Sequence, residues 1–202
     1  MARDNIDHDG FNRDDIKALR EAETPSDMPF TLGKISHVVL KVADLERSVE
    51  FYTKVLGMRV SDAYPESMMP GRMVFMRCNH DHHGIALVGG AAGPADASEL
   101  HHFAFEVETL DEVFRAREHL ERHNVPISFE GRRRAGQQIA VEFRDPDGHN
   151  LEICWGMDRI GPGESPRSPE GWVTAMSLED AVANPPEGQV MQLADRSLLR
   201  TG

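Results

Sequence analysis

Two histidines and one glutamate are the residues of this chain whose types and spacing suggest chemistry. His37 and His102 lie 65 residues apart, each at the same place in one of two similar stretches of sequence. Glu152 comes near the end of the second stretch, where alternation turns it away from the apolar face. Two imidazoles and one carboxylate that leave three positions open are the ligand set of non-haem Fe(II) oxygenases. Because a lone carboxylate on a core strand is unfavourable to bury without a cation, this set predicts a divalent-metal site.

Each of the two histidines belongs to a segment with the alternation of a β-strand. Within residues 35–42 and 100–107, apolar side chains fill one face, and the histidines lie on the other. A helix follows each segment, the first with Asp44 as its N-cap and the second with a capping box at Thr109. Three strand candidates follow each helix: residues 58–63, 72–77 and 83–88, and then 125–129, 139–143 and 150–155.

The two series of elements share one offset. The helix caps are separated by the same 65 residues as the histidines, which indicates pseudo-twofold symmetry and turns both imidazoles toward one concave space. We expect an α+β fold in which two βαβββ repeats form a curved mixed sheet around a metal cavity. The offset also makes Leu87 the equivalent of Glu152, and because leucine cannot ligate, three protein ligands are expected rather than four.

An ordinary structural role is the alternative for each histidine. A single strand histidine is most often satisfied by a hydrogen bond, but the equivalence of His37 and His102, together with Glu152, favours the metal. His101 precedes His102 and points the other way, so we expect it to be structural.

Four segments resemble the vicinal oxygen chelate superfamily, whose members include glyoxalase I, fosfomycin-resistance thiol transferases, bleomycin-binding proteins and type I extradiol dioxygenases. The segments are ISHVVL at residues 35–40, FYTKVLG at 51–57, LHHFAF at 100–105 and DPDGHNLE at 145–152. The resemblance extends over residues 33–157. It supports the expected fold, but it does not select one activity, because this fold hosts several chemistries.

One further segment is similar to the extradiol dioxygenases in particular. Residues 79–87, NHDHHGIAL, resemble the stretch that carries the acid–base histidine of those enzymes, which implies this role for His83. We also expect His83 to share a strand face with Leu87 and to look toward the metal. A neutral imidazole there could take a proton from a catechol hydroxyl. A solvated loop histidine is the alternative.

Two positions depart from the extradiol pattern, and both concern the substrate. Glu142 stands where those enzymes usually have a substrate-binding tyrosine. The loop of residues 131–136 contains Arg133 and Arg134 where several of them have a histidine. Guanidinium groups pair well with carboxylates, so these arginines could bind an acidic substrate group, with a solvated loop as the alternative.

The resemblance implies a non-haem Fe(II)-dependent extradiol dioxygenase that cleaves a catechol-type ring. Its partners would be a small aromatic diol and O₂, and Mn(II) or another divalent ion is the alternative cofactor. Two other classes remain open. One is a different metal-dependent enzyme on the same scaffold, such as an isomerase, lyase or thiol transferase. The other is a metal-free small-molecule binding protein.

The composition indicates which partners and which cell compartment to expect. With 22 Lys and Arg against 34 Asp and Glu, the net charge of −12 argues against nucleic acid and anionic membranes as partners. Two cysteines and an N-terminus without an apolar signal segment fit the cytoplasm. A homodimer or higher homo-oligomer is expected.

Three parts are predicted along the chain. Residues 1–32 form a polar N-terminal arm, and residues 33–157 form the module, with repeats at 33–90 and 100–157. Residues 158–202 form a Gly- and Pro-rich C-terminal extension that contains a short helix.

Overall fold

The computed structural model describes residues 7–23, 35, 37–95, 100–160, 162–165 and 167–200. The first repeat consists of β1 (Val38–Lys41), α3 (Leu45–Lys54), β2 (Arg59–Tyr64), β3 (Met73–Arg77) and β4 (Ile85–Val88). Its strands form one sheet in the order β1-β4-β3-β2. In this sheet β1 and β4 are parallel, and the other neighbours are antiparallel.

The second repeat copies the first. It consists of β5 (Phe103–Glu106), α4 (Leu110–Arg122), β6 (Ile127–Arg132), β7 (Ile139–Arg144) and β8 (Asn150–Trp155). The strand order is β5-β8-β7-β6, again with one parallel pair, β5 and β8. The prediction of an α+β fold built from two βαβββ repeats is therefore confirmed.

The helices begin where the caps predicted them. Asp44 accepts a hydrogen bond from the backbone N–H of Arg47 at 3.0 Å, which satisfies one of the amides exposed at the start of α3. Glu112 accepts from the backbone N–H of Thr109 at 2.8 Å and completes the capping box of α4. Gly57, with a φ of +67°, supplies the left-handed residue just beyond α3.

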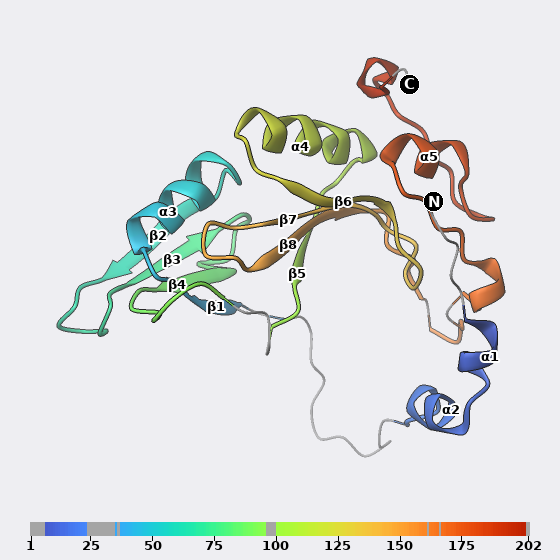
Figure 1. Ribbon diagram of the computed structural model, residues 1–202, viewed down its shortest axis with the longest axis horizontal. Coiled ribbons are helices and arrows are strands. Elements are labelled where there is room, and N and C mark those ends of the chain that lie inside the picture. The colour runs from blue at the N-terminus through green and yellow to red at the C-terminus, as the bar shows by residue number, and fades with distance from the viewer. Residues whose placement is uncertain are drawn as a thin grey trace.

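Both helices cover the same side of the two sheets (Figure 1). A single hydrophobic core lies between the helices and the sheets, and in it Tyr52 from α3, Phe114 from α4 and Leu151 from β8 are almost fully buried. The rings of Phe51 and Phe143 lie 6.5 Å apart and join α3 to β7. The two repeats therefore share one core, and this fixes the position of one sheet relative to the other.

The opposite face of the first sheet carries a second, small apolar cluster. It is formed by Met73, Phe75, Ala86 and Val88, with Tyr64 and Met69 packed against it.

The expected equivalence of Leu87 and Glu152 is wrong. Leu87 packs in the main core, on the helix side of the sheet. In the parallel pairs, Val39 lies beside Ala86 and Ala104 lies beside Glu152, and Val39 and Ala104 are the residues 65 positions apart. Ala86 is therefore the equivalent of Glu152, and alanine cannot ligate a metal either.

The C-terminal segment lies beside the second repeat, the N-terminal segment contacts the C-terminal one, and both contain short helices. Near the N-terminus are α1 (His8–Phe11) and α2 (Asp14–Arg20), and Phe11 packs edge-on against Trp172 at 5.4 Å. The C-terminal segment contains η1 (Pro169–Gly171), α5 (Leu178–Ala183) and η2 (Arg196–Leu198). Figure 1 shows α1 next to this segment. Among the described helices, none combines the length and the apolar character that crossing a bilayer requires.

Buried arginines fasten the C-terminal segment to the second repeat. The guanidinium of Arg132 on β6 donates to the backbone carbonyls of Ala181 and Asn184 at the C-terminal end of α5. Carbonyl groups at a helix end lack intrahelical donors, so a cation is favourable there. Arg132 is thus a structural residue and not part of a solvated loop.

Candidate metal centre

Glu152 and His102 meet on the face of the second sheet that points away from α4. Because β5 and β8 are parallel neighbours, Ala104 lies beside Glu152, and His102 comes just before β5 on the same face. His102 Nε2 lies 3.5 Å from Glu152 Oε2. The Glu152 side chain is only 4% exposed, whereas that of His102 is 44% exposed. Two of the three predicted ligands are therefore in contact, with the carboxylate at the bottom and the imidazole open to solvent.

The surroundings of the Glu152 carboxylate are mostly neutral. Gln138 Nε2 donates to Glu152 Oε1 at 3.4 Å. The buried thiol of Cys154 also hydrogen-bonds Glu152, and its pKa is raised to about 12, mainly by burial and then by the charges of Glu152 and Glu106. A buried carboxylate with neutral donors is under-compensated, so its environment suits a cation.

His37 pairs with His83 at the first sheet. Their ring centres are 4.7 Å apart, and the ring of His83 also lies edge-on to Phe75 at 5.0 Å. Burial lowers the pKa of His83, and the neighbouring His37 and His82 add to this effect. Neutral imidazole is the form that can accept a proton.

The face of His83 was predicted from strand alternation, and that argument is wrong. β4 begins only at Ile85, and the N–H of Gly84 bonds the carbonyl of Met76, so His83 lies outside the regular strand. Its contact with Phe75 shows that it lies on the face opposite to Leu87.

His37 and His102 line the same cavity, which has a volume of about 440 Å³. Its walls come from the start of β1, from the connection between β3 and β4, and from β5, with Cys78, Asn79 and Asp81 at the β3–β4 connection. The cavity therefore lies between the two repeats. This agrees with the expectation that both imidazoles face one shared space.

In the part of the chain that is described, no three His, Cys, Asp or Glu side chains stand close enough to hold a metal ion together. The structure brings His102 to Glu152 and His37 to His83, and it brings His37 and His102 to one cavity, but it does not bring the three predicted ligands together. The chemical types of the three predicted ligands still fit a divalent cation, because they combine two imidazoles with a carboxylate whose charge is only partly compensated.

His101 has a closer relationship to the site than expected. Its Nδ1 lies 2.7 Å from His102 Nδ1, so one of these nitrogens donates to the other. Its backbone carbonyl accepts from the side chain of Asn150 at 2.8 Å. His101 is thus the hydrogen-bond partner of Nδ1 of His102, the ring nitrogen that does not face Glu152. The two adjacent histidines do not simply point to opposite sides.

Glu142 and Arg133 are bonded to each other. Arg133 Nε and Nη2 donate to the two carboxylate oxygens of Glu142, both at 2.8 Å. An acidic substrate group would have to displace Glu142 in order to reach Arg133. Arg134 is exposed, and its backbone carbonyl accepts from Gln137.

Residues 34–153 match the family model of the Glyoxalase/Bleomycin resistance protein/Dioxygenase superfamily. The chain belongs to this superfamily. A solved glyoxalase/bleomycin resistance protein/dioxygenase domain from Frankia sp. EAN1pec is similar in fold, with a TM-score of 0.54 and 24% identity. The similarity covers 62% of this chain and 99% of that one.

Several curated relatives are named as extradiol dioxygenases, and one, of Homo sapiens, as a mitochondrial methylmalonyl-CoA epimerase. Biphenyl-2,3-diol 1,2-dioxygenase of Paraburkholderia xenovorans (strain LB400) is 32% identical over 124 residues, which are 60% of this chain and 40% of that protein. Manganese-dependent 2,3-dihydroxybiphenyl 1,2-dioxygenase of Geobacillus genomosp. 3 is 26% identical over 71% of this chain and 41% of its own length. An iron-dependent extradiol dioxygenase of Rhodococcus jostii (strain RHA1) is 28% identical over 66% of this chain and 47% of its own length. The chain thus spans less than half the length of these three dioxygenases.

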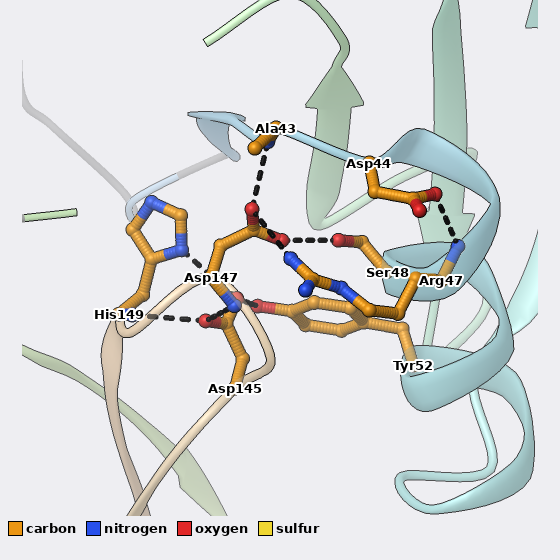
Figure 2. A network of polar contacts seen from close by, with 8 residues as sticks. All are labelled: Ala43, Asp44, Arg47, Ser48, Tyr52, Asp145, Asp147 and His149. Carbon is orange, nitrogen blue, oxygen red and sulfur yellow. Dashed lines mark hydrogen bonds and ion pairs between the residues drawn. The ribbon is translucent and has the colours of Figure 1, made fainter. Parts of the chain in front are cut away.

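The superfamily match includes both sides of a polar network that joins the repeats (Figure 2). Asp147, in the turn between β7 and β8, is buried and accepts three hydrogen bonds from the first repeat. Its donors are the backbone N–H of Ala43 at 2.7 Å, Arg47 Nη2 at 3.1 Å and the hydroxyl of Ser48 at 2.5 Å. The turn is thereby fixed at the start of α3.

Asp145 makes the second half of this network. One of its oxygens accepts from the Tyr52 hydroxyl at 3.0 Å and lies 2.9 Å from His149 Nδ1. Its other oxygen accepts from the backbone N–H groups of Asp147 and His149. In the sequence, residues 145–149 were considered only as part of the DPDGHNLE segment that resembles the superfamily. Their residue types offered a signal for more, since two aspartates in a turn before a core strand need donors if they are buried.

The network has a consequence for the predicted ligand residues. It ties the beginning of β8, which carries Glu152, to the segment between β1 and α3, which follows His37. The distance between the two halves of the candidate site is thus set partly by Asp145 and Asp147.

Proposed function

We propose that the chain is a divalent-metal-dependent extradiol dioxygenase that opens a catechol-type ring with O₂, and that Fe(II) is its metal, with Mn(II) as the alternative. The observation that carries this proposal is the contact between buried Glu152 and His102 beside the cavity that His37 also lines. The names of the relatives support it, and they include both an iron-dependent and a manganese-dependent enzyme.

His37, His102 and Glu152 would hold the ion, with His37 approaching the other two across the cavity. A bound ion of this kind supplies Lewis acidity toward the diol oxygens and a path for electron density between diol and O₂. Three ligands leave room for both substrates. The protein would contribute the orientation of the diol and a cavity wall of limited polarity.

His83 would move the proton. Its Nδ1 lies 3.1 Å from Nδ1 of His82, so Nε2 is the nitrogen that we assign to the substrate. Because its ring lies against His37 and Phe75, the imidazole is held beside the proposed ligand and against an apolar surface. A diol bound at this place could pass a hydroxyl proton to His83 Nε2.

We propose that three residues determine which substrates can bind: Glu142, Arg133 and Arg134. The first two would present a closed ion pair to the substrate, and Arg134 an exposed guanidinium. A diol without an acidic group requires no opening of this pair, so uncharged catechols are the first compounds to test.

The test is anaerobic loading with Fe(II), followed by catechol, 3-methylcatechol and 2,3-dihydroxybiphenyl with O₂. We expect oxygen uptake matched by a yellow ring-fission product, and loss of both in His83→Gln. His80→Gln is the matched control, because His80 is an exposed histidine of the same connection between β3 and β4. Turnover of another substrate with Mn(II) or Zn(II) and without oxygen uptake would instead indicate an isomerase, lyase or thiol transferase.

A metal-free small-molecule binding protein is the second candidate. The observation that favours it is that three ligands do not come together within the described ranges. Protein purified without bound metal, and unchanged in stability by Fe(II) or Mn(II), would decide for this candidate and against the dioxygenase.

A further inference from the structure

A row of side chains crosses the second sheet on the face of the candidate metal centre. The strand register places Ala104, Glu152, Glu142 and Phe129 side by side on β5, β8, β7 and β6. Glu142 and Glu152 are therefore like charges directly opposed on neighbouring strands. Such an arrangement is unfavourable unless a cation lies with the pair.

Arg133 is that cation, but it bonds only one of the two carboxylates. Its guanidinium forms the two 2.8 Å bonds to Glu142 and stacks over the ring of Phe129, 3.6 Å from the ring centre. A two-pronged bond combined with stacking fixes the orientation of the guanidinium. The pKa of Arg133 is raised mainly by its hydrogen bonds with Glu142 and to a lesser degree by the charge of Glu152, so Glu152 is also within its field.

The pairing of Arg133 with Glu142 leaves Glu152 without a cation bonded to it. Arg133 and Glu142 neutralise each other, and Glu152 has the amide of Gln138 and the thiol of Cys154 as hydrogen-bond donors. We propose that Glu142 is a positioning residue that holds Arg133 away from Glu152 and thereby keeps the Glu152 carboxylate available for a divalent cation. This inference rests on the proposed metal centre.

A specific consequence follows for a variant without the Glu142 charge. The Arg133 guanidinium, half exposed and on a long side chain, would then have Glu152 as its carboxylate partner on this face. An Arg133–Glu152 pair would compete directly with the metal for the carboxylate oxygens. Removing Arg133 as well would remove the competitor and restore the site.

The experiment is a titration of the full chain with Mn(II) alone, in which free Mn(II) is followed by electron paramagnetic resonance. Glu142→Gln should bind Mn(II) about 10- to 100-fold more weakly than wild type, as is typical when a group next to a ligand is lost. The double variant Glu142→Gln/Arg133→Gln should regain the wild-type affinity. Glu106→Gln is the matched control, since it removes one carboxylate that pairs with Arg159 on the same sheet. Near-ultraviolet circular dichroism confirms that each variant is folded.

Two results would overturn this inference alone. Either Glu142→Gln binds Mn(II) as wild type does, or the double variant is as weak as Glu142→Gln, in which case Glu142 acts through its own charge. Wild-type protein that does not bind Mn(II), or Glu152→Gln that binds it unchanged, would overturn the metal centre together with the role of Glu142.

Discussion

Tyr52 donates a hydrogen bond to Asp145 over 3.0 Å, although the two residues are 93 positions apart in the chain. Tyr52 belongs to the helix of the first repeat, and Asp145 begins the turn that leads into the last strand of the second. Burial raises the pKa of Tyr52 well above its usual value, with the nearby Asp145 adding to the effect, so the hydroxyl stays protonated and remains a donor. This bond is one of the physical links through which the fold sets the separation of His37 and Glu152.

The first prediction concerns this bond. Tyr52→Phe keeps the ring in the core but removes the donor to a buried carboxylate, so it should lower the free energy of unfolding by about 1–3 kcal/mol. Urea denaturation measures the change. Tyr64→Phe is a suitable control, because its ring packs on Phe75 in the small cluster, away from this network. Equal stability of Tyr52→Phe and wild type would show that the hydroxyl bond contributes nothing to joining the repeats.

The second prediction is a pH dependence that arises from His149. Its hydrogen bond with Asp145 raises the pKa of His149 above its ordinary value, despite burial, and the charge of Asp147 acts in the same direction. A raised folded-state pKa means that the stabilisation is fully present below about pH 6.5 and is lost as the pH rises through the folded-state pKa. Wild type should therefore exceed His149→Gln in unfolding free energy more at about pH 5.5 than at about pH 8.5.

Denaturant curves of both proteins at the two pH values provide the measurement. Other titrating groups affect both proteins alike, so the difference between them isolates His149. A difference that grows with pH would contradict the assigned direction and would mean that the folded protein holds His149 preferentially neutral.

The third prediction concerns the attachment of the C-terminal segment. Arg117 on α4 is fully buried and donates to Glu179 of α5 at 2.9 and 3.1 Å and to the carbonyl of Leu198 at 3.2 Å. Arg117→Met should destabilise the protein by about 3 kcal/mol, because it removes the cationic partner of Glu179 and the side-chain donor to the carbonyl of Leu198.

Limited proteolysis gives a second readout of the same change. Cleavage within residues 167–200 should become faster in Arg117→Met than in Arg122→Met, which removes an exposed arginine from the end of the same helix. Identical cleavage rates in the two variants would mean that the hydrogen bonds of Arg117 do not hold this segment, and that the bonds of Arg132 to α5 and the apolar contacts are enough.

Much of the fold could be predicted because it depends on patterns among residues that are close in sequence. The alternation of apolar residues and the caps at Asp44 and Thr109 depend only on neighbours in sequence, and the shared offset revealed the repeat. His102 and Glu152, two of the three predicted ligands, lie in contact because the first and last strands of the second repeat are parallel neighbours.

What could not be predicted depends on contacts between distant parts of the chain. The three bonds from the first repeat to Asp147 bridge about a hundred residues, and no local pattern specifies them. The equivalence of Leu87 with Glu152 was wrong because the offset between the repeats is 65 residues for β1 and β5 but 66 for β4 and β8, where Ala86 matches Glu152. In a strand, a shift of one residue moves a side chain to the opposite face. The pairing of Arg133 with Glu142 required knowing that β6 and β7 are neighbours.

The last prediction tests the metal-ligand role of Glu152 separately from its place in the fold. Glu152→Gln keeps the size of the side chain and can still bond with Gln138 and Cys154, so it should remain folded or become slightly more stable, because a buried charge is removed. Its affinity for Mn(II), measured by calorimetry, should nevertheless fall by at least about 100-fold, since a neutral amide replaces the only anionic ligand. Glu106→Gln, on the neighbouring strand, should bind as wild type does. Unchanged Mn(II) binding by Glu152→Gln would remove this carboxylate, and with it the pair formed by His102 and Glu152, from any metal site in the protein.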